Sequence, residues 1–285
     1  MLPSARIVAF ISIHCSVVGR AQSSLTPAPR YLQAEMLRHV ANVPGLVRLV
    51  HSNQGHPQHG PHASGSMQLR SQQASASLSE PPFLVTSPFG RCLEIGDDAG
   101  IILGAVASAA KTVGELAKLE PPVLHRDLSL GNIIVLPEDL EQAIAEGGRI
   151  RAFLLDLATA CEAPGGQVAS TSITELTGTP LFMAISILEG GPHTVSSDLE
   201  SLFLLLVFLG SRGHVHWANA RPEWREASAL NLLALTPGEL FFEKYVHQRC
   251  RPDLFGAVQR LQKLFFVPSY NREVTVPQFL NALNV

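Results

Sequence analysis

The feature that most constrains this chain is the segment 123–135, in which a short polar stretch separates two apolar runs. His125, Arg126 and Asp127 follow the first run, and four residues separate this triplet from Asn132. Apolar runs on both sides of a polar turn predict buried segments joined by a loop. An Asp in such a loop can orient a hydroxyl and accept its proton, and an Asn five residues on can hold a metal ion that bridges phosphate oxygens. The spacing predicts a catalytic loop, and the alternative is a polar turn before a buried strand.

The residues after this segment continue the pattern. Residues 150–155 predict a strand that ends at Asp156, and a loop rich in Ser, Thr and Gly follows over 159–179. Ser197 and Asp198 then predict the cap of a strongly apolar helix. That helix is too apolar for a surface, so we expect it to form the buried axis of the second half of the chain.

Upstream segments alternate between helix and strand patterns. Apolar spacing predicts a helix over 31–40, strands over 46–50 and 82–86, and a long apolar helix over 101–119. Residues 51–80 are rich in His, Gln, Ser and Gly. Their His residues are irregularly spaced and no carboxylate lies among them before Glu80, which favours a solvated, disordered insert over a metal site.

The N-terminal run over 7–18 is mostly apolar and follows a single positive side chain, which is typical of a secretory signal peptide. His14 and Arg20 favour the alternative, a buried β-strand. No other run is expected to reach the length of a membrane span.

Composition limits the cellular setting and the partners. The four Cys residues lie far apart without a CxxC pair, which indicates reduced thiols in a cytoplasmic protein; secretion is the alternative if the first residues are a signal peptide. The net charge of −3, from 21 basic and 24 acidic side chains, predicts no nucleic-acid surface. We also expect no membrane association.

The order of these elements resembles the large lobe of a protein kinase, and the motifs are most similar to those of fungal-type protein kinases. The likeness covers roughly residues 31–285 and is strongest over 123–209. Its motifs are His125-Arg126-Asp127 with Ser129 and Asn132, Asp156-Leu157-Ala158, Gly178-Thr179-Pro180 with Leu181-Phe182-Met183-Ala184, and Ser197-Asp198-Leu199-Glu200-Ser201 before an apolar run.

This resemblance implies a role for each matching residue. Asp127 would be the catalytic base, while Asn132 and Asp156 would hold Mg²⁺ for ATP. The implied supporting residues are His125, Arg126, Thr179, Asp198 and Glu35.

The resemblance also implies an α+β, two-lobed fold. Residues 1–90 would form a reduced N-terminal β lobe that includes the disordered insert. Residues 91–285 would form a mostly helical C-terminal lobe. A protein would be the substrate or docking partner.

Several positions depart from the family pattern. No Lys occurs before Lys111 and no Gly-x-Gly-x-x-Gly loop precedes it, so Glu35 would lack its usual partner. Arg20 is a weaker substitute, because a planar guanidinium does not match a point-charge Lys contact. Ser186 stands where the family has a Glu that anchors the activation segment, which predicts a looser segment, and Ala158 in place of Gly is expected to restrict the loop.

Two hypotheses follow from this balance. The first is a protein kinase that transfers phosphate from ATP to Ser or Thr, with Ser and Thr residues of 170–177 as candidate phosphosites and Arg126 as their basic partner. The second is a pseudokinase, or a truncated kinase, that acts as a binding or scaffold module.

Overall fold

The computed structural model describes residues 29–52, 84–136, 150–168, 178–215, 246, 248–267 and 269–284. Four features predicted from the sequence lie outside these ranges: the N-terminal strand or signal peptide, Arg20, residues 53–80 of the insert, and the candidate phosphosites of 170–177.

Helices and strands are both well represented, so the fold is of the α+β type. The helices and 3-10 turns are α1 (Pro29–His39), α2 (Ala99–Leu116), η1 (Leu130–Asn132), η3 (Pro180–Phe182), α4 (Ile185–Leu188), α5 (Val195–Gly210), α7 (Pro252–Phe266) and α8 (Val276–Leu283). The strands are β1 (Arg48–Ser52), β2 (Leu84–Ser87), β3 (Arg91–Cys92), β4 (Val123–Leu124), β5 (Ile133–Val135), β6 (Ala152–Leu154), β7 (Cys161–Glu162), β8 (Gln167–Val168) and β9 (His193–Thr194).

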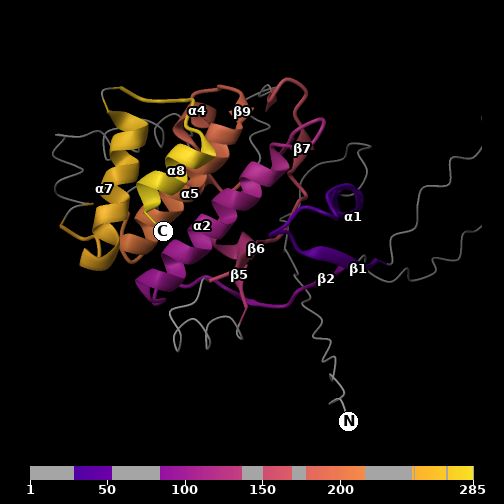
Figure 1. The fold of residues 1–285 in the computed structure, drawn as a ribbon, viewed down its shortest axis with the longest axis horizontal. Helices are drawn as coiled ribbons and strands as arrows, with labels where there is room; N and C mark the ends of the chain where they lie inside the picture. The colour runs from indigo at the N-terminus through magenta and orange to yellow at the C-terminus, as the bar shows by residue number, and fades with distance from the viewer. Residues whose placement is uncertain are drawn as a thin grey trace, which may run out of the picture.

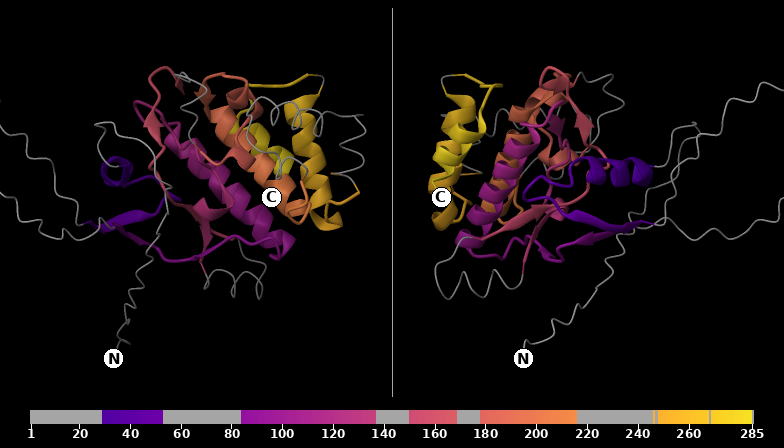
Figure 2. Two further views of the ribbon diagram at one scale, coloured as in Figure 1. Left: turned by 180° about the vertical axis from the view of Figure 1, so that it is seen from behind. Right: turned by 45° about the vertical axis from the view of Figure 1, so that its right-hand side comes forward.

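Helix α2 runs through the middle of the molecule, with α1, β1 and β2 on one side and α7 and α8 on the other (Figures 1 and 2). Its small and branched residues allow close packing, and the face formed by Ile102, Ala105, Val106, Ala109 and Val113 is buried. Helices α5 and α8 and strand β6 pack against it.

Helix α2 is also the one described helix that is long and apolar enough to cross a membrane, by length and composition alone. The expectation that no segment beyond the first residues reaches that length was therefore wrong. More than half of the helix is buried by its neighbours, as is usual for the core helix of a folded domain.

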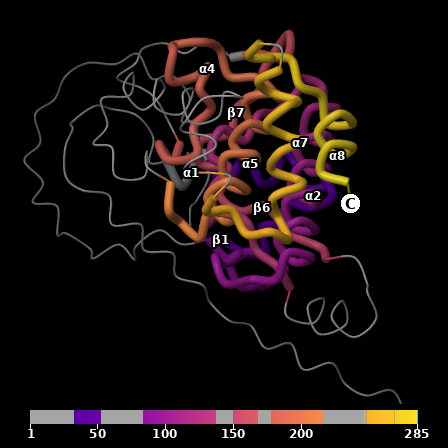
Figure 3. The backbone as a smooth tube through the Cα atoms, turned by 90° about the vertical axis from the view of Figure 1, so that its left-hand side faces the viewer, coloured from indigo at the N-terminus to yellow at the C-terminus, as the bar shows by residue number. Residues whose placement is uncertain are grey.

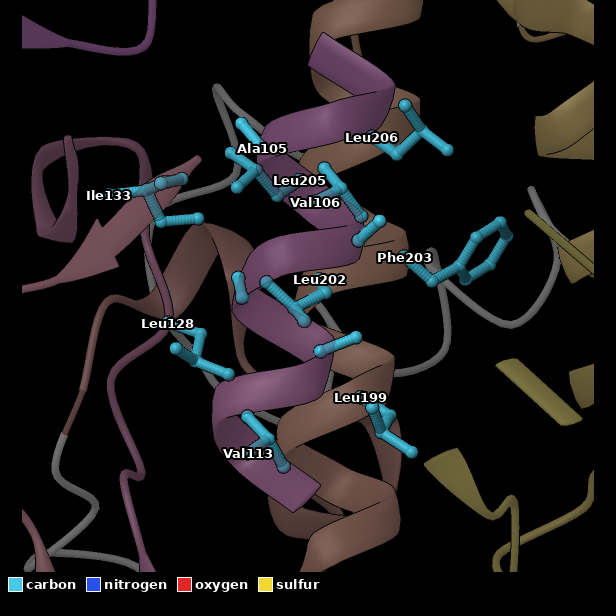
Figure 4. Packing of buried hydrophobic residues seen from close by; sticks show 14 of the residues in the cluster. Ala105, Val106, Val113, Leu128, Ile133, Leu199, Leu202, Phe203, Leu205 and Leu206 are labelled. Atoms are coloured by element: carbon cyan, nitrogen blue, oxygen red, sulfur yellow. The ribbon is translucent and has the colours of Figure 1, made fainter. Parts of the chain in front are cut away.

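Helix α5 forms the second core element, as its apolar sequence predicts. Its side chains from Leu202 to Val207 are fully buried. Figure 4 shows Leu128 and Ile133 on one side of α2, while Phe203 points the other way, toward the C-terminal helices. There its ring stacks on Phe265 with centroids 5.5 Å apart, and α7 packs along α5 (Figure 3).

The predicted cap of α5 was wrong by about one turn. Thr194 is the N-cap residue: its side chain accepts a hydrogen bond from the backbone N–H of Ser197 (3.2 Å), and the Ser197 hydroxyl accepts one from the N–H of Thr194 (2.9 Å). This capping box fixes the start of the helix, and it leaves Asp198 inside the first turn, where its carboxylate can serve another loop.

The described residues also form four small sheets. Strands β3, β5 and β6 form a three-stranded antiparallel sheet, while β1 pairs with β2, β4 with β7, and β8 with β9. Strand β1 extends to Ser52, so the predicted strand is displaced by two residues, and the predicted disordered insert cannot begin at 51. The other predicted helices and strands are confirmed within two or three residues at each end. The predicted loop over 159–179 is wrong in part, because the two-residue strands β7 and β8 lie within it and pair with β4 and β9.

Candidate functional site

The catalytic loop predicted from the sequence lies between β4 and β5, and its centre is the carboxylate of Asp127. One oxygen, Oδ1, accepts hydrogen bonds from the backbone N–H (2.8 Å) and the hydroxyl (2.7 Å) of Thr179. The other, Oδ2, accepts one from the side-chain amide of Asn132 (3.2 Å). These three hydrogen bonds hold the carboxylate in one orientation. Asp127 is only half-buried, so the residue remains accessible.

Asn132 and Asp156 lie at the same end of the β5–β6 pair. Ile133 pairs with Leu154, and the Leu155 N–H donates to the Asn132 carbonyl (2.9 Å), so the chain reaches Asp156 one residue later. The Asn132 amide nitrogen also donates to the Asp127 carbonyl (2.9 Å), and Asp156 Oδ1 accepts from the Ala158 N–H (3.1 Å).

This donor set fits a magnesium ion. These hydrogen bonds engage the amide nitrogen of Asn132 and one oxygen of Asp156, and each residue has a further side-chain oxygen. Mg²⁺ is held in nucleotide sites by one or two such oxygen ligands together with substrate phosphates. Within the described ranges, no group of three or more His, Cys, Asp or Glu side chains could hold a metal by itself.

Asp198 supports the loop from α5, as the sequence resemblance implied it would. Its carboxylate is 3% exposed and accepts hydrogen bonds from the backbone N–H groups of His125 (2.9 Å) and Arg126 (3.0 Å). Burial raises the pKa of Asp198, against the opposing effect of these donors and of the neighbouring His125 and Arg126.

His125 ties the loop to the strand that carries Asp156. Its Nε2 lies 2.9 Å from the carbonyl oxygen of Leu155, and its own carbonyl accepts from the hydroxyl of Thr159 (3.0 Å). The Thr159 contact could not be predicted, because Thr159 falls in a polar stretch with no regular sequence pattern.

Two residues of the site are in the left-handed backbone region that non-glycine residues rarely adopt: Arg126 (φ 68°) and Asp156 (φ 52°). Such conformations cost about 1–3 kcal/mol each and persist where the surrounding structure fixes them. Ala158 is not among the residues with positive φ, so the expected restriction at this position has no consequence in this conformation. Leu157 is buried in the core.

Gly178 lies against the backbone of the loop formed by residues 125–132. Its φ is 115°, and a Cβ atom at this position would lie 2.6 Å from the carbonyl oxygen of Arg126. Only glycine permits this approach, and the approach brings Thr179 to Asp127.

A small, partly enclosed hollow lies beside Asp127 and Thr179. Met183, Ala184 and Ile187 supply apolar walls, and His193 lies at its border. Burial, followed by the charge of Arg126, lowers the pKa of His193 to about 4, so its ring is neutral at pH 7. Arg126 also donates to the sulfur of Cys161 (3.4 Å).

Glu35 is not drawn into the site. It is exposed on α1, whose buried face carries Ala34, Leu37 and Val40, and none of the ion pairs among the described residues includes it. The polar link from α1 is His39, whose Nε2 lies 3.6 Å from Glu162 of β7.

Ser186 stands where the family has a Glu that anchors the segment, and Glu189, three residues further along, makes an ion pair instead. Glu189, at the end of α4, accepts a hydrogen bond of 2.6 Å from the guanidinium of Arg272. Glu200 and Tyr270 hold the start of the same helix through its backbone. The prediction of a looser segment is therefore not supported for α4. Glu189, Glu200, Tyr270 and Arg272 were not predicted to act together, because Tyr270 and Arg272 are far from α4 in the sequence.

A helical core that supports a His-Arg-Asp loop, with an Asn and a further Asp at the ends of adjacent strands, defines a protein-kinase-like domain. The family model for fungal protein kinases matches residues 51–209, more than half of the chain. The chain belongs to the fungal protein kinase family. It is also 29% identical over 115 residues to cyclic GMP-binding protein C of Dictyostelium discoideum, a match that covers 40% of this chain and 4% of that protein.

Proposed function

We propose that this chain is a protein serine/threonine kinase, which transfers the terminal phosphoryl group of ATP to a hydroxyl of a protein substrate. In this proposal the substrate oxygen forms a bond to the γ-phosphorus, the bond to the leaving ADP oxygen breaks, and the hydroxyl proton passes to Asp127. The observation that carries the proposal is the orientation of that carboxylate by Thr179 and Asn132.

The other residues of the site have roles in positioning. Asn132 and Asp156 would hold Mg²⁺, which neutralises the charge on the phosphates. Asp198 and His125 keep the loop backbone in place, because their contacts span from α5 to β6. The architecture we infer is two-lobed, with residues 1–90 as a reduced small lobe and residues 91–285 as the large lobe.

Glu35 favours a second candidate, a pseudokinase that acts as a binding or scaffold module. In active kinases an α-helical Glu pairs with a Lys that contacts the phosphates. Glu35 is exposed and takes no part in the ion pairs of the described residues. A domain that binds partners through the same fold would need neither group.

Nucleotide binding and phosphate transfer distinguish the two candidates. Saturating ATP with Mg²⁺ should raise the thermal unfolding temperature, and labelled phosphate should pass to a generic protein substrate. Asp127→Asn should lower the transfer rate by about 10²- to 10⁴-fold with little change in stability. Asp253→Asn, an exposed Asp in the first turn of α7, is the matched control and should leave the rate unchanged.

Each failure has its own meaning. No thermal shift at saturating ATP would contradict the kinase proposal and favour the binding module. Transfer that persists in Asp127→Asn at the wild-type rate would show that another group accepts the proton.

A further inference from the structure

Helix α4 begins without a capping side chain of its own. Its N-cap residue is Ala184, which has no polar side chain, so the first backbone N–H groups need acceptors from elsewhere. The N–H of Ile185 donates to Glu200 Oε1 (3.0 Å), and the N–H of Ser186 donates to the Tyr270 oxygen (2.9 Å). The Tyr270 hydroxyl in turn donates to Glu200 Oε2 (2.5 Å), which closes the arrangement.

Burying Glu200 in the core costs free energy, because the carboxyl group loses its hydration. It is 2% exposed on α5, and burial raises its pKa to about 7 and also raises the pKa of Tyr270. A buried carboxylate is costly unless hydrogen bonds satisfy it, and an apolar residue of similar size often gives equal or greater stability. We therefore attribute to Glu200 a function in fixing geometry rather than in adding stability.

The same loop that supplies Tyr270 also holds the other end of α4. The guanidinium of Arg272 lies 5.3 Å from the centre of the Tyr270 ring and donates to Glu189, the C-cap residue of α4. Phe266 stacks on Tyr270 with ring centroids 5.5 Å apart, so the tyrosine has a defined position. Residues from α5 and from the loop before α8 thus fix both ends of this short helix.

Helix α4 is part of the site, because Ile187, together with Met183 and Ala184 just before it, forms apolar walls of the hollow beside Asp127. We propose that Glu200 and Tyr270 are positioning residues: they set the place of α4, and through it the surface on which a polypeptide substrate lies next to Asp127. This proposal rests on the proposed kinase function. It predicts an effect on the protein substrate and none on the nucleotide.

Amide hydrogen exchange tests the arrangement without any need for activity. In Tyr270→Phe, exchange of the peptide covering residues 185–188 should become about tenfold faster or more, because Ser186 loses its acceptor. Glu200→Ala should have the same effect, and the nearly isosteric Glu200→Gln should restore most of the protection. Glu115→Ala, a half-exposed Glu of α2 that pairs with Lys118, is the control and should leave these amides at the wild-type rate.

Steady-state kinetics test whether Glu200 and Tyr270 affect the binding of the protein substrate. In Tyr270→Phe and Glu200→Ala, KM for the protein substrate should rise about tenfold while KM for ATP stays at the wild-type value. Reversal of the outer ion pair should rescue its single variants: Glu189→Arg and Arg272→Glu together should bring the 185–188 exchange rate back toward wild type.

Three results would overturn the proposal. The first is amide exchange at the wild-type rate over residues 185–188 in both Tyr270→Phe and Glu200→Ala. The second is faster exchange spread evenly over α2 and α5, which would indicate general destabilisation. The third is an equal rise of both KM values. If the wild-type chain transfers no phosphate, the proposed function fails, and the exchange measurements alone decide whether Glu200 and Tyr270 position α4.

Discussion

Replacing Asp198 by alanine should destabilise the protein through two backbone groups that are more than seventy residues away in sequence. The carboxylate accepts hydrogen bonds from the N–H groups of His125 and Arg126, and all of these groups are buried or half-buried. A buried donor left without an acceptor costs about 1–3 kcal/mol, so two donors cost about 2–6 kcal/mol.

Part of this cost is returned, because the variant no longer buries a carboxylate whose pKa is raised by burial. We therefore expect a net loss of about 2–4 kcal/mol in the free energy of unfolding. That loss is a large share of the 5–15 kcal/mol that is usual for a folded domain.

Urea unfolding followed by circular dichroism measures this loss, and hydrogen exchange locates it. The amides of residues 125–126 should lose protection before those of α5 do. Asp253→Ala is the matched control, because Asp253 also lies in the first turn of a helix but its ion pair with Arg251 is partly exposed and worth about 0–1 kcal/mol. A change below about 0.5 kcal/mol in Asp198→Ala, with full protection of both amides, would refute the reasoning.

Two further predictions concern Gly178 and His193. Gly178→Ala should lower phosphate transfer at least about tenfold, because the new methyl group would displace the Arg126 carbonyl; Gly165→Ala, which also has positive φ but meets no atom, should cost only about 1 kcal/mol of stability, and equal effects of the two variants in both assays would refute the steric argument. Burial lowers the pKa of His193 to about 4, so between pH 4 and 6.5 the unfolded chain binds more protons than the folded chain. The free energy of unfolding of the wild type should therefore fall by about 3 kcal/mol as the pH falls through this window. His193→Gln should lack this loss when urea unfolding is measured at each pH, and a profile identical to that of the wild type would contradict the assignment.

The local features of this protein could be predicted from its amino-acid pattern. The apolar pattern was sufficient to predict α2 and α5 as helices, because apolar residues recur through both segments at helical spacing. The spacing from His125 to Asn132, between two apolar runs, was sufficient to predict a polar loop joining two buried strands. The family resemblance also indicated Asp198 as the support of the loop, although its position inside the first turn and the cap at Thr194 needed the structure.

The distant groups that contact the site became known only from the packing of the helices and strands. Glu200 and Tyr270 are 70 residues apart, and Arg272 and Glu189 are 83 apart, and neither pair belongs to a periodic or spaced pattern. Glu35 was expected in the site, yet the helix that carries it buries its apolar face and leaves this carboxylate exposed. These cases have the same cause. A local sequence pattern determines which residues form a helix or strand, but the hydrogen-bond partners of a polar side chain depend on how the helices and strands pack. A local pattern contains no information about that packing.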